Sequence, residues 1–335
     1  CATGWARGEA RVKNTLSPPI QAASGQGITS RLYASDRDLL DMYRLLMEGR
    51  AQTDDWRYPH VGDLGWWYFM VACHLDPKQH IRLWHAGDEL VGYAILNEDP
   101  NFDVQVLPAY AWQGIEAEAF CWAEQKIDEL CQVDATLWGG PIISGTRQDD
   151  LKRIEFLEGH GFRVGGPFSE VNMLCMLDGP IPEFTLPPGS QVRAMMADDP
   201  AELTDRAGAQ REVWQPWTVG NVSDGDYAQL MRLPAYEREL DIVAIAPDGV
   251  IASYVNGWID PLNKIGDFGP LGTRPAYRRQ GFSQAALAEC LRRMRARGMQ
   301  RVSVSTGVDN TPAIRLYESV GFTIVKKYLE YIKPA

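Results

Sequence analysis

Two neighbouring arginines beside a glycine form the segment of this chain that is best suited to hold an anion. The turn reads Arg278-Arg279-Gln280-Gly281-Phe282-Ser283, and it lies between an expected strand, 269–273, and an expected helix, 283–297. Backbone N–H groups and the positive end of the helix dipole meet at a helix start, and arginine adds charge-assisted hydrogen bonds. The turn is therefore a candidate phosphate site; the alternative is a solvated basic helix start.

Local patterns predict the elements around this turn. Strands are expected at 192–195, 242–245 and 250–258, the last two joined as a hairpin by a Pro-Asp-Gly turn. The helix that follows the candidate site ends at Gly298 and presents one apolar face, formed by Leu287, Cys290, Leu291 and Met294.

Two further elements follow towards the end of the chain. A strand is expected at 301–306, followed by a helix for which Thr311 is the expected N-cap and Pro312 the first-turn residue. A last strand runs from 322 towards 332.

A repeat relates the two halves of the sequence. PAYAWQGIE at 108–116 matches PAYRRQGFS at 275–283 in five of nine positions, with an offset of 167 residues. FLEGHGF at 156–162 repeats as LYESVGF at 316–322, with an offset of 160. Because order and spacing are both preserved, the sequence predicts a tandem duplication.

The turn and the downstream repeat resemble two signatures of the GNAT superfamily of N-acetyltransferases. The first signature, Arg/Gln-x-x-Gly-x-Gly/Ala, matches at 278–283, where Ser283 replaces the usual Gly or Ala but is still small. The second, Asn-x-x-Ala-x-x-x-Tyr-x-x-x-Gly-Phe, matches at each named position from Asn310 to Phe322. The resemblance is strong over 191–334, and the whole chain is similar to the two-domain members of the superfamily, of which mycothiol synthase is an example.

The resemblance implies an α/β (α+β) fold of two tandem GNAT-like domains, each with a mixed, mostly antiparallel central sheet flanked by helices. It also implies acetyl-CoA as the cosubstrate. Its expected contacts are the turn, Asn310, and backbone groups of the preceding strand at Leu271, Gly272 and Thr273. Tyr317 takes the position of the general acid that protonates the departing CoA thiolate, with core packing as the alternative, and Asn310 is equally compatible with a helix cap.

The sequence leaves several candidates for the group that accepts the proton of the amine. All five histidines fall in the first half of the sequence, so the second half must use another group. Asp267 lies just before the expected strand 269–273, near where many relatives place a carboxylate, but a solvated turn aspartate fits the same pattern. Glu212, Glu237 and Asp260 compete with it, and water-mediated deprotonation or binding of a neutral amine needs no dedicated base.

The first copy of the turn departs from the pattern. Ala111 stands in place of Arg278, and Glu116 stands in place of Ser283. A carboxylate at the helix start repels phosphates, and no arginine offsets it. Because Leu157 also replaces Tyr317, we expect the first domain to keep the fold without binding acyl-CoA, as a scaffold or as one wall of the substrate pocket.

Proline, glycine and charge patterns suggest the domain boundaries. We expect a flexible tail at 1–27, a degenerate GNAT-like domain at 28–177, a Pro-rich linker at 178–190 and a catalytic GNAT domain at 191–335. Aromatic side chains that could line an amine pocket or simply pack are Trp214, Trp217 and Tyr227, and, in the first copy, Trp66, Trp67 and Tyr68.

Composition narrows the class of protein. A net charge of −11, from 33 basic and 44 acidic residues, argues against a nucleic-acid partner. The six cysteines form no CxxC pair, so we expect reduced thiols, a cytoplasmic location and no metal. No apolar run is long enough to span a membrane, and no signal-peptide pattern opens the chain.

These observations together predict a cytoplasmic N-acetyltransferase that acts on the primary amine of a small molecule, by direct attack in a ternary complex. One alternative is a mycothiol-synthase-like acetylation of an amine on a thiol conjugate. Another is a sensor that binds acyl-CoA or another ligand without turnover.

Overall fold

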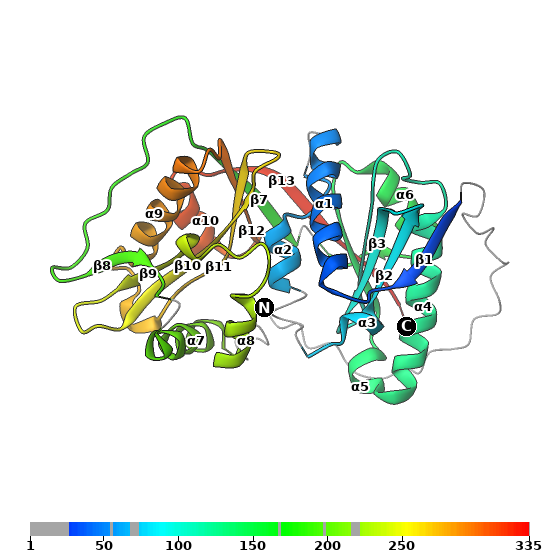
Figure 1. The fold of residues 1–335 in the computed structure, drawn as a ribbon, viewed down its shortest axis with the longest axis horizontal. Helices are drawn as coiled ribbons and strands as arrows, with labels where there is room; N and C mark the ends of the chain where they lie inside the picture. The colour runs from blue at the N-terminus through cyan, green and yellow to red at the C-terminus, as the bar shows by residue number, and fades with distance from the viewer. Residues whose placement is uncertain are drawn as a thin grey trace. The chain divides into compact units, whose positions relative to one another are not determined.

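The computed structural model describes residues 27–53, 56–67, 74–166, 169–196, 199–215 and 222–334. The chain forms two compact units (Figure 1). The first consists of Cys1–Leu45, Leu75–Pro167 and Leu329–Ala335, and the second of Leu46–His74 and Phe168–Tyr328. Of the expected flexible tail, only Gly27 lies within the described residues.

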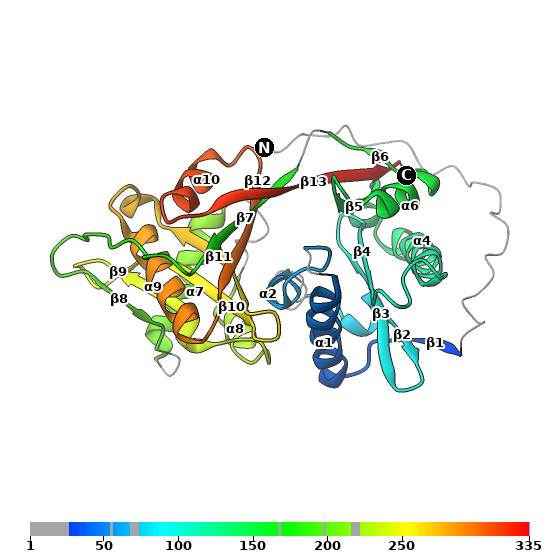
Figure 2. The same cartoon turned by 90° about the horizontal axis from the view of Figure 1, so that it is seen from above.

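The first unit is built on a sheet of order β1-β2-β3-β4-β5-β13, with α4 and α6 on one of its faces (Figure 2). Its own strands are β1 (Ile28–Leu32), β2 (Ile81–Ala86), β3 (Glu89–Asn97), β4 (Asn101–Val106), β5 (Ile142–Arg147) and the short β6 (Arg163–Val164). Its helices are the first part of α1 (Asp36–Thr53), α3 (Pro77–His80), α4 (Ile115–Val133), α5 (Ala135–Trp138) and α6 (Leu151–Gly159).

The second unit is built on a sheet of order β13-β7-β12-β11-β10-β9-β8. The strands are β7 (Glu170–Met176), β8 (Gln191–Ala194), β9 (Asp241–Ile245), β10 (Ile251–Asp260), β11 (Ile265–Thr273), β12 (Arg301–Gly307) and β13 (Thr323–Lys333). The helices are α2 (Val61–Trp66), α7 (Pro200–Trp214), α8 (Asp224–Leu230), α9 (Phe282–Ala296) and α10 (Thr311–Glu318), with 3-10 turns at Arg238–Leu240 and Pro275–Tyr277. Its registered strand pairs are antiparallel except β11 with β12.

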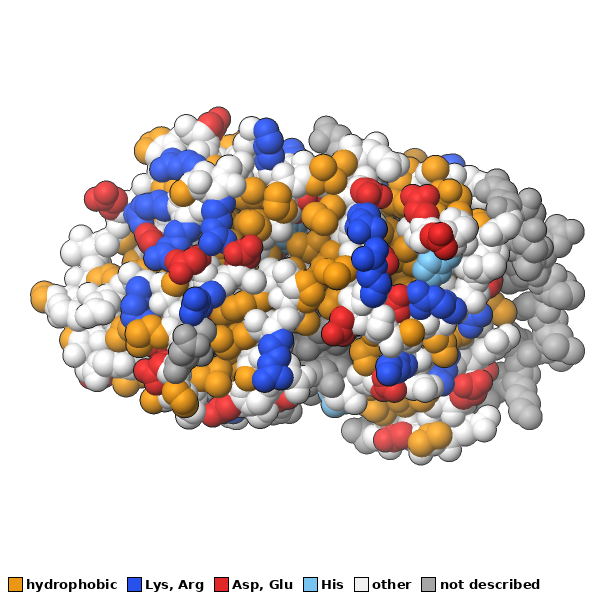
Figure 3. All heavy atoms as spheres, viewed as in Figure 1, with side chains coloured by type: hydrophobic (Ala, Val, Ile, Leu, Met, Phe, Trp, Pro, Cys, Tyr) orange, Lys and Arg blue, Asp and Glu red, His pale blue; other side chains and the backbone are white. Residues whose placement is uncertain are grey.

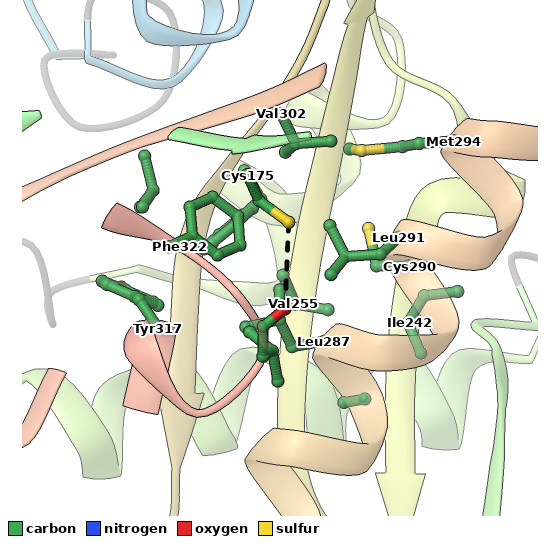
Figure 4. Close-up of a cluster of buried hydrophobic side chains, with 14 of the residues drawn as sticks. Cys175, Ile242, Val255, Leu287, Cys290, Leu291, Met294, Val302, Tyr317 and Phe322 are labelled. Carbon is green, nitrogen blue, oxygen red and sulfur yellow. Dashed lines mark hydrogen bonds between the residues drawn. The ribbon is translucent and has the colours of Figure 1, made fainter. Parts of the chain in front are cut away.

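Alternating side chains divide the core of the second unit between the two faces of its sheet. On β9, Ile242 and Ala244 pack with α9 and α10, whereas Val243 packs with α2, α7 and α8. The apolar face expected for α9 is confirmed, since all four predicted residues are fully buried against the sheet (Figure 4). In the same view Cys175 of β7 donates a weak hydrogen bond to the carbonyl of Val320 at 3.8 Å.

The two halves of the chain show the same succession of elements, as the repeat predicted. Each half runs from an edge strand through a helix into a three-stranded meander, then a long helix, a strand, a short helix and a final strand. Two details of the expectation are wrong. The strand expected at 269–273 begins at Ile265, and the N-cap of α10 is Asn310, with Thr311 as the first helical residue.

The compact units do not coincide with the boundaries expected from composition. Strand β7, from the first half of the sequence, pairs with β12 and β13 in the second unit, and the end of β13 lies in the first unit. Helix α2 also belongs to the second unit. The expected linker is docked there too, because Ile181, Phe184 and Leu186 pack on the core. Hydrogen bonding and apolar contact thus group residues that are distant in sequence.

Candidate active site

The turn before α9 presents several backbone donors at one place. Gly281 is the N-cap with φ 88°, and Arg279 has φ 62°, so two left-handed residues shape the turn. The first helical hydrogen bond runs from Ala285 N to Gly281 O at 2.9 Å, which leaves the N–H groups of 282–284 without a helical acceptor. No side chain of the described residues caps this end. This is the backbone geometry of an anion site.

The charges at the turn are not neutralised by neighbouring acids. Arg278 and Arg279 are exposed, and neither has an acidic partner in the described parts of the chain; Arg278 Nε donates to Thr273 O at 3.3 Å. The arginines further along α9 are paired, Arg292 and Arg293 with Glu289 and Arg297 with Glu237. Figure 3 shows this mixture of basic and acidic side chains over α9. An anionic ligand at the turn would therefore meet two guanidinium groups, those of Arg278 and Arg279, that are not paired with acids of the described residues.

The remaining turn residues position the backbone. The Phe282 side chain is buried and packs edge-to-face on Tyr277 with ring centroids 6.0 Å apart, and Gln280 Nε2 donates to Ala276 O at 3.1 Å. A Cβ on Gly281 would lie 3.3 Å from Thr185 O, so glycine is needed for the approach of the 178–190 segment as well as for its positive φ. Ser283 is half-buried in the first turn of α9.

The strand that leads into the turn separates from its neighbour. β11 and β12 pair in parallel only from Ile265 to Asp267, opposite Arg301 to Ser303, although both strands continue further. Leu271, Gly272 and Thr273 lie in the diverging part, where the described residues show pairing only with β10. The edge of β11 that faces β12 can therefore offer backbone N–H and C=O groups to an extended ligand.

Asp267 lies at the point where the two strands separate. The expectation of a solvated turn aspartate is wrong, because β11 begins two residues earlier and the side chain is buried with 7% exposure. Its carboxyl accepts a hydrogen bond from Ser303 Oγ. Burial, and next the charge of Asp63, raise the pKa of Asp267 well above its usual range.

Tyr317 is buried on α10 within reach of the same strand. Its ring contacts Phe268 edge-to-face, with ring centroids 5.4 Å apart. The ring of Phe322 lies nearby, with centroids 6.0 Å apart, and Figure 4 shows Tyr317 and Phe322 in the same cluster. Its hydroxyl has no hydrogen-bond partner in the part of the chain that is described. Burial, and then the charge of Asp267, raise the pKa of this phenol, which therefore keeps its proton at neutral pH.

Asn310 is the N-cap of α10, which is one of the two roles that the sequence suggested for it. Its Oδ1 accepts from Ala313 N at 3.3 Å, and its Nδ2 donates to Thr306 Oγ1 at 3.2 Å. The residue is exposed, and its expected contact with acetyl-CoA stays a prediction.

Comparisons with known proteins agree with this geometry. Residues 208–322 match the acetyltransferase (GNAT) family. A mycothiol acetyltransferase of Salinispora arenicola is 27% identical over 270 residues, which cover 76% of this chain and 81% of that protein. One from Arthrobacter sp. strain FB24 is 25% identical over 249 residues, covering 71% and 72%.

Solved structures share the fold across nearly the whole chain. A tandem GNAT protein from the clavulanic acid biosynthesis pathway has a TM-score of 0.63 at 13% identity, covering 92% of this chain and 98% of its own. The chain thus has the fold of the tandem GNAT proteins, and its residues 208–322 match the GNAT family. A GCN5-related N-acetyltransferase from Sphaerobacter thermophilus has a TM-score of 0.60 at 21% identity, covering 92% and 95%.

One part of this GNAT site comes from the first half of the sequence. All five histidines lie in the first half of the sequence, as noted, but His60 belongs to the second unit, where it is the fully buried N-cap of α2. Gly62 of α2 packs directly on Trp258, and Asp63 follows it. Sequence reasoning missed this helix because histidine is an unusual N-cap. The available signal was Asp63 three residues after His60, as in a capping box.

The other carboxylates considered are engaged elsewhere. Glu212 is half-exposed near Arg274, Glu237 pairs with Arg297, and Asp260 is buried and accepts from Asn263. Among the aromatic candidates, Trp66 and Tyr227 are core residues, Trp67 is exposed, and Trp214 Nε1 donates to Tyr254 Oη at 2.9 Å. Tyr68 and Trp217 lie outside the described residues.

The GNAT turn of the first unit is filled by a side chain. Gly114 and Trp112 have φ of 114° and 61°, as in the second copy. Glu116 Oε1 accepts from Trp112 N at 2.8 Å, and the residue is only 5% exposed. The carboxylate thus does more than repel a phosphate, since it already occupies a backbone donor of the turn.

A second side chain lies along the diverging strands of the first unit. β4 and β5 pair only at Asn101 and Ile143. Arg153 Nη1 donates to Val104 O at 2.9 Å, and its Nη2 donates to Asp103 at 2.8 Å. By the repeat, Arg153 corresponds to Ala313, and Val104 to Leu271. The Arg153 side chain is therefore hydrogen-bonded to the carbonyl of Val104. The equivalent residue of the second unit, Leu271, is an expected backbone contact of the cofactor.

Two features are absent from the described residues. No three His, Cys, Asp or Glu side chains are grouped in a way that could hold a metal ion. None of the described helices combines the length and apolar character that crossing a membrane requires.

Proposed function

We propose that the second unit transfers an acetyl group from acetyl-CoA to the primary amine of a small molecule, by direct attack in a ternary complex. The observation that carries the proposal is the continuity of the site. The open edge of β11 runs directly into the turn with its free backbone donors, and Tyr317 contacts Phe268 of the same strand.

Each part has a role in this reaction. The N–H groups of 281–283 with Arg278 and Arg279 bind the pyrophosphate, while Leu271, Gly272 and Thr273 pair with the pantetheine arm through their backbones. A strand N–H polarises the thioester carbonyl as the amine attacks. Tyr317, which is buried and protonated, donates its proton to the departing thiolate.

The names of two similar proteins and the net charge of this chain support the proposed class of acceptor. Two relatives are named mycothiol acetyltransferases, which supports an amine on a small thiol conjugate as the second candidate acceptor. The net charge of −11 favours a small molecule over nucleic acid. We propose a cytoplasmic location, and we propose that the first unit binds no acyl-CoA, since Glu116 and Arg153 occupy its turn and strand edge.

Calorimetric titration with acetyl-CoA tests the cofactor assignment. One site per chain is expected, and Ser283→Glu should abolish it, because the new carboxylate can fill the turn as Glu116 does in the first unit. Ser283→Gln is the matched control and should bind with little change. Two sites in the wild type would refute the degenerate first unit, and no binding would refute the proposal.

Release of CoA thiol in the presence of amines tests turnover. The probes are glucosamine, spermidine and a cysteinyl amino-sugar conjugate. Release with the conjugate alone would favour the mycothiol-like reaction. Binding of acetyl-CoA without release for any amine would favour the sensor alternative.

A further inference from the structure

The segment 178–190 joins β7 to β8, and we call it the strap. It is described throughout and contains no helix or strand, yet it is fixed to the C-terminal half of α9 by two hydrogen bonds. Arg295 Nη1 donates to Gly179 O at 3.0 Å. Arg292 Nη2, one turn earlier in the helix, donates to Pro182 O at 3.1 Å. The strap therefore runs antiparallel to α9, towards the start of the helix.

The far end of the strap lies against the turn that precedes α9. A Cβ on Gly281 would lie 3.3 Å from Thr185 O and 3.7 Å from Leu186 Cδ2. Leu186 is half-buried and packs on the core that lies under α9. Its side chain thus lies next to the backbone of the turn and is itself held by the core.

The hairpin between β9 and β10 supports the same turn. Tyr277 Oη donates to Asp248 Oδ2 of the hairpin at 2.6 Å, and the Tyr277 ring packs edge-to-face on Phe282. The strap also meets this hairpin, because a Cβ on Gly189 would lie 3.6 Å from Pro247 Cβ. The strap, the hairpin and the turn therefore form one contiguous set of contacts.

These contacts have a conformation to maintain. Arg279 has φ 62°, in a region that is disfavoured for a residue with a side chain, and Gly281 has φ 88°. Such a backbone persists only where the surrounding structure holds it. An anion that meets donors already fixed in place does not have to order them, so a fixed turn binds more tightly than a loose one.

We propose that Leu186 is a positioning residue for the cofactor, which holds the turn in the conformation that presents its backbone donors. The role in cofactor binding rests on the proposed function; the support of the turn by Leu186 does not. Leu186 lies outside residues 208–322, which match the GNAT family, and outside the expected catalytic domain, 191–335. The segment that was expected to be only a linker thus completes the cofactor site.

Leu186→Ala tests the proposal, with Ile181→Ala as its matched control. Both residues are half-buried aliphatic anchors of the strap on the same core, but Ile181 precedes Pro182, whose partner Arg292 lies about 16 Å along the helix axis from Gly281. Both variants should lose similar stability in urea. The Kd of acetyl-CoA should rise about five- to tenfold in Leu186→Ala alone, and Leu186→Met, which restores a side chain of similar volume, should bind as the wild type does. Equal changes of Kd in the two alanine variants would overturn the proposal.

Amide NMR of the full chain tests the support of the turn without any ligand. The backbone resonances of 279–283 should shift in Leu186→Ala and stay in place in Ile181→Ala. Unchanged resonances in a folded Leu186→Ala variant would also overturn the proposal. Should that variant fail to fold, Leu186→Val, which lacks the Cδ atoms near Gly281, replaces it in both measurements. If the wild type binds no acetyl-CoA, the proposed function fails, and the amide resonances decide alone whether Leu186 holds the turn.

Discussion

At the scale of single residues, burial decides which groups have useful chemistry. Asp267 and Tyr317 are ordinary residue types whose protonation is set by the side chains around them, and both keep a proton to higher pH than they would in water. A carboxyl with a raised pKa is a stronger base, and a protonated phenol can donate to sulfur. Neither property can be predicted from residue type alone.

Removing only the hydroxyl of Tyr317 tests its role as the acid. Tyr317→Phe keeps the ring that packs on Phe268 and Phe322, so acetyl-CoA affinity and thermal stability should change little. Turnover should fall by about 10²–10⁴-fold, the usual contribution of general acid catalysis. Thiol release and calorimetry measure the two effects, and an unchanged kcat would assign Tyr317 to packing.

The burial of the Glu116 carboxylate lowers the stability of the folded protein by an amount that depends on pH. Burial raises its pKa above the unfolded value, so between those two values the folded protein binds more protons and stability falls as pH rises. Glu116→Gln keeps an acceptor for Trp112 N and removes the charge, so it should raise Tm at pH 7 and lose that advantage at pH 4. A Tm difference that is constant with pH would contradict this assignment.

At the scale of elements, the sequence was informative where interactions are local. The apolar face of α9 follows from the spacing of Leu287, Cys290, Leu291 and Met294, and the turn follows from its glycine and flanking patterns. The positions of α2 and β7 depend on partners more than 90 residues away, so no local pattern could give them. Asp267 was misjudged for the same reason, since its cover comes from α2.

The docking of α2 can be tested with a single methyl group. In Gly62→Ala the new Cβ would overlap the Trp258 ring, and relieving that overlap should cost about 1–3 kcal/mol of stability in urea unfolding. Gly159→Ala, in the last turn of α6 with nothing within 4 Å of its Cβ, is the matched control and should be neutral or slightly stabilising. Equal effects of the two changes would contradict close packing of α2.

At the scale of the whole molecule, the two halves of the sequence are not two independent folding units. The second compact unit contains β7, the final strand of the first half, together with α2, and the first unit contains the end of β13. The expected catalytic domain, 191–335, therefore lacks the strand that pairs with both β12 and β13.

Separating the halves should reveal this dependence. A fragment of residues 191–335 loses Val171, Met173 and Leu177 from the core. At about 1.5–3 kcal/mol for each buried side chain, the loss approaches the total stability of about 5–15 kcal/mol that a domain has. It should show no cooperative unfolding by circular dichroism, whereas a fragment of residues 168–335, which restores β7, should regain a transition. If the fragments 191–335 and 168–335 unfold at the same temperature, β7 does not contribute to the stability of the second unit, and this prediction is wrong.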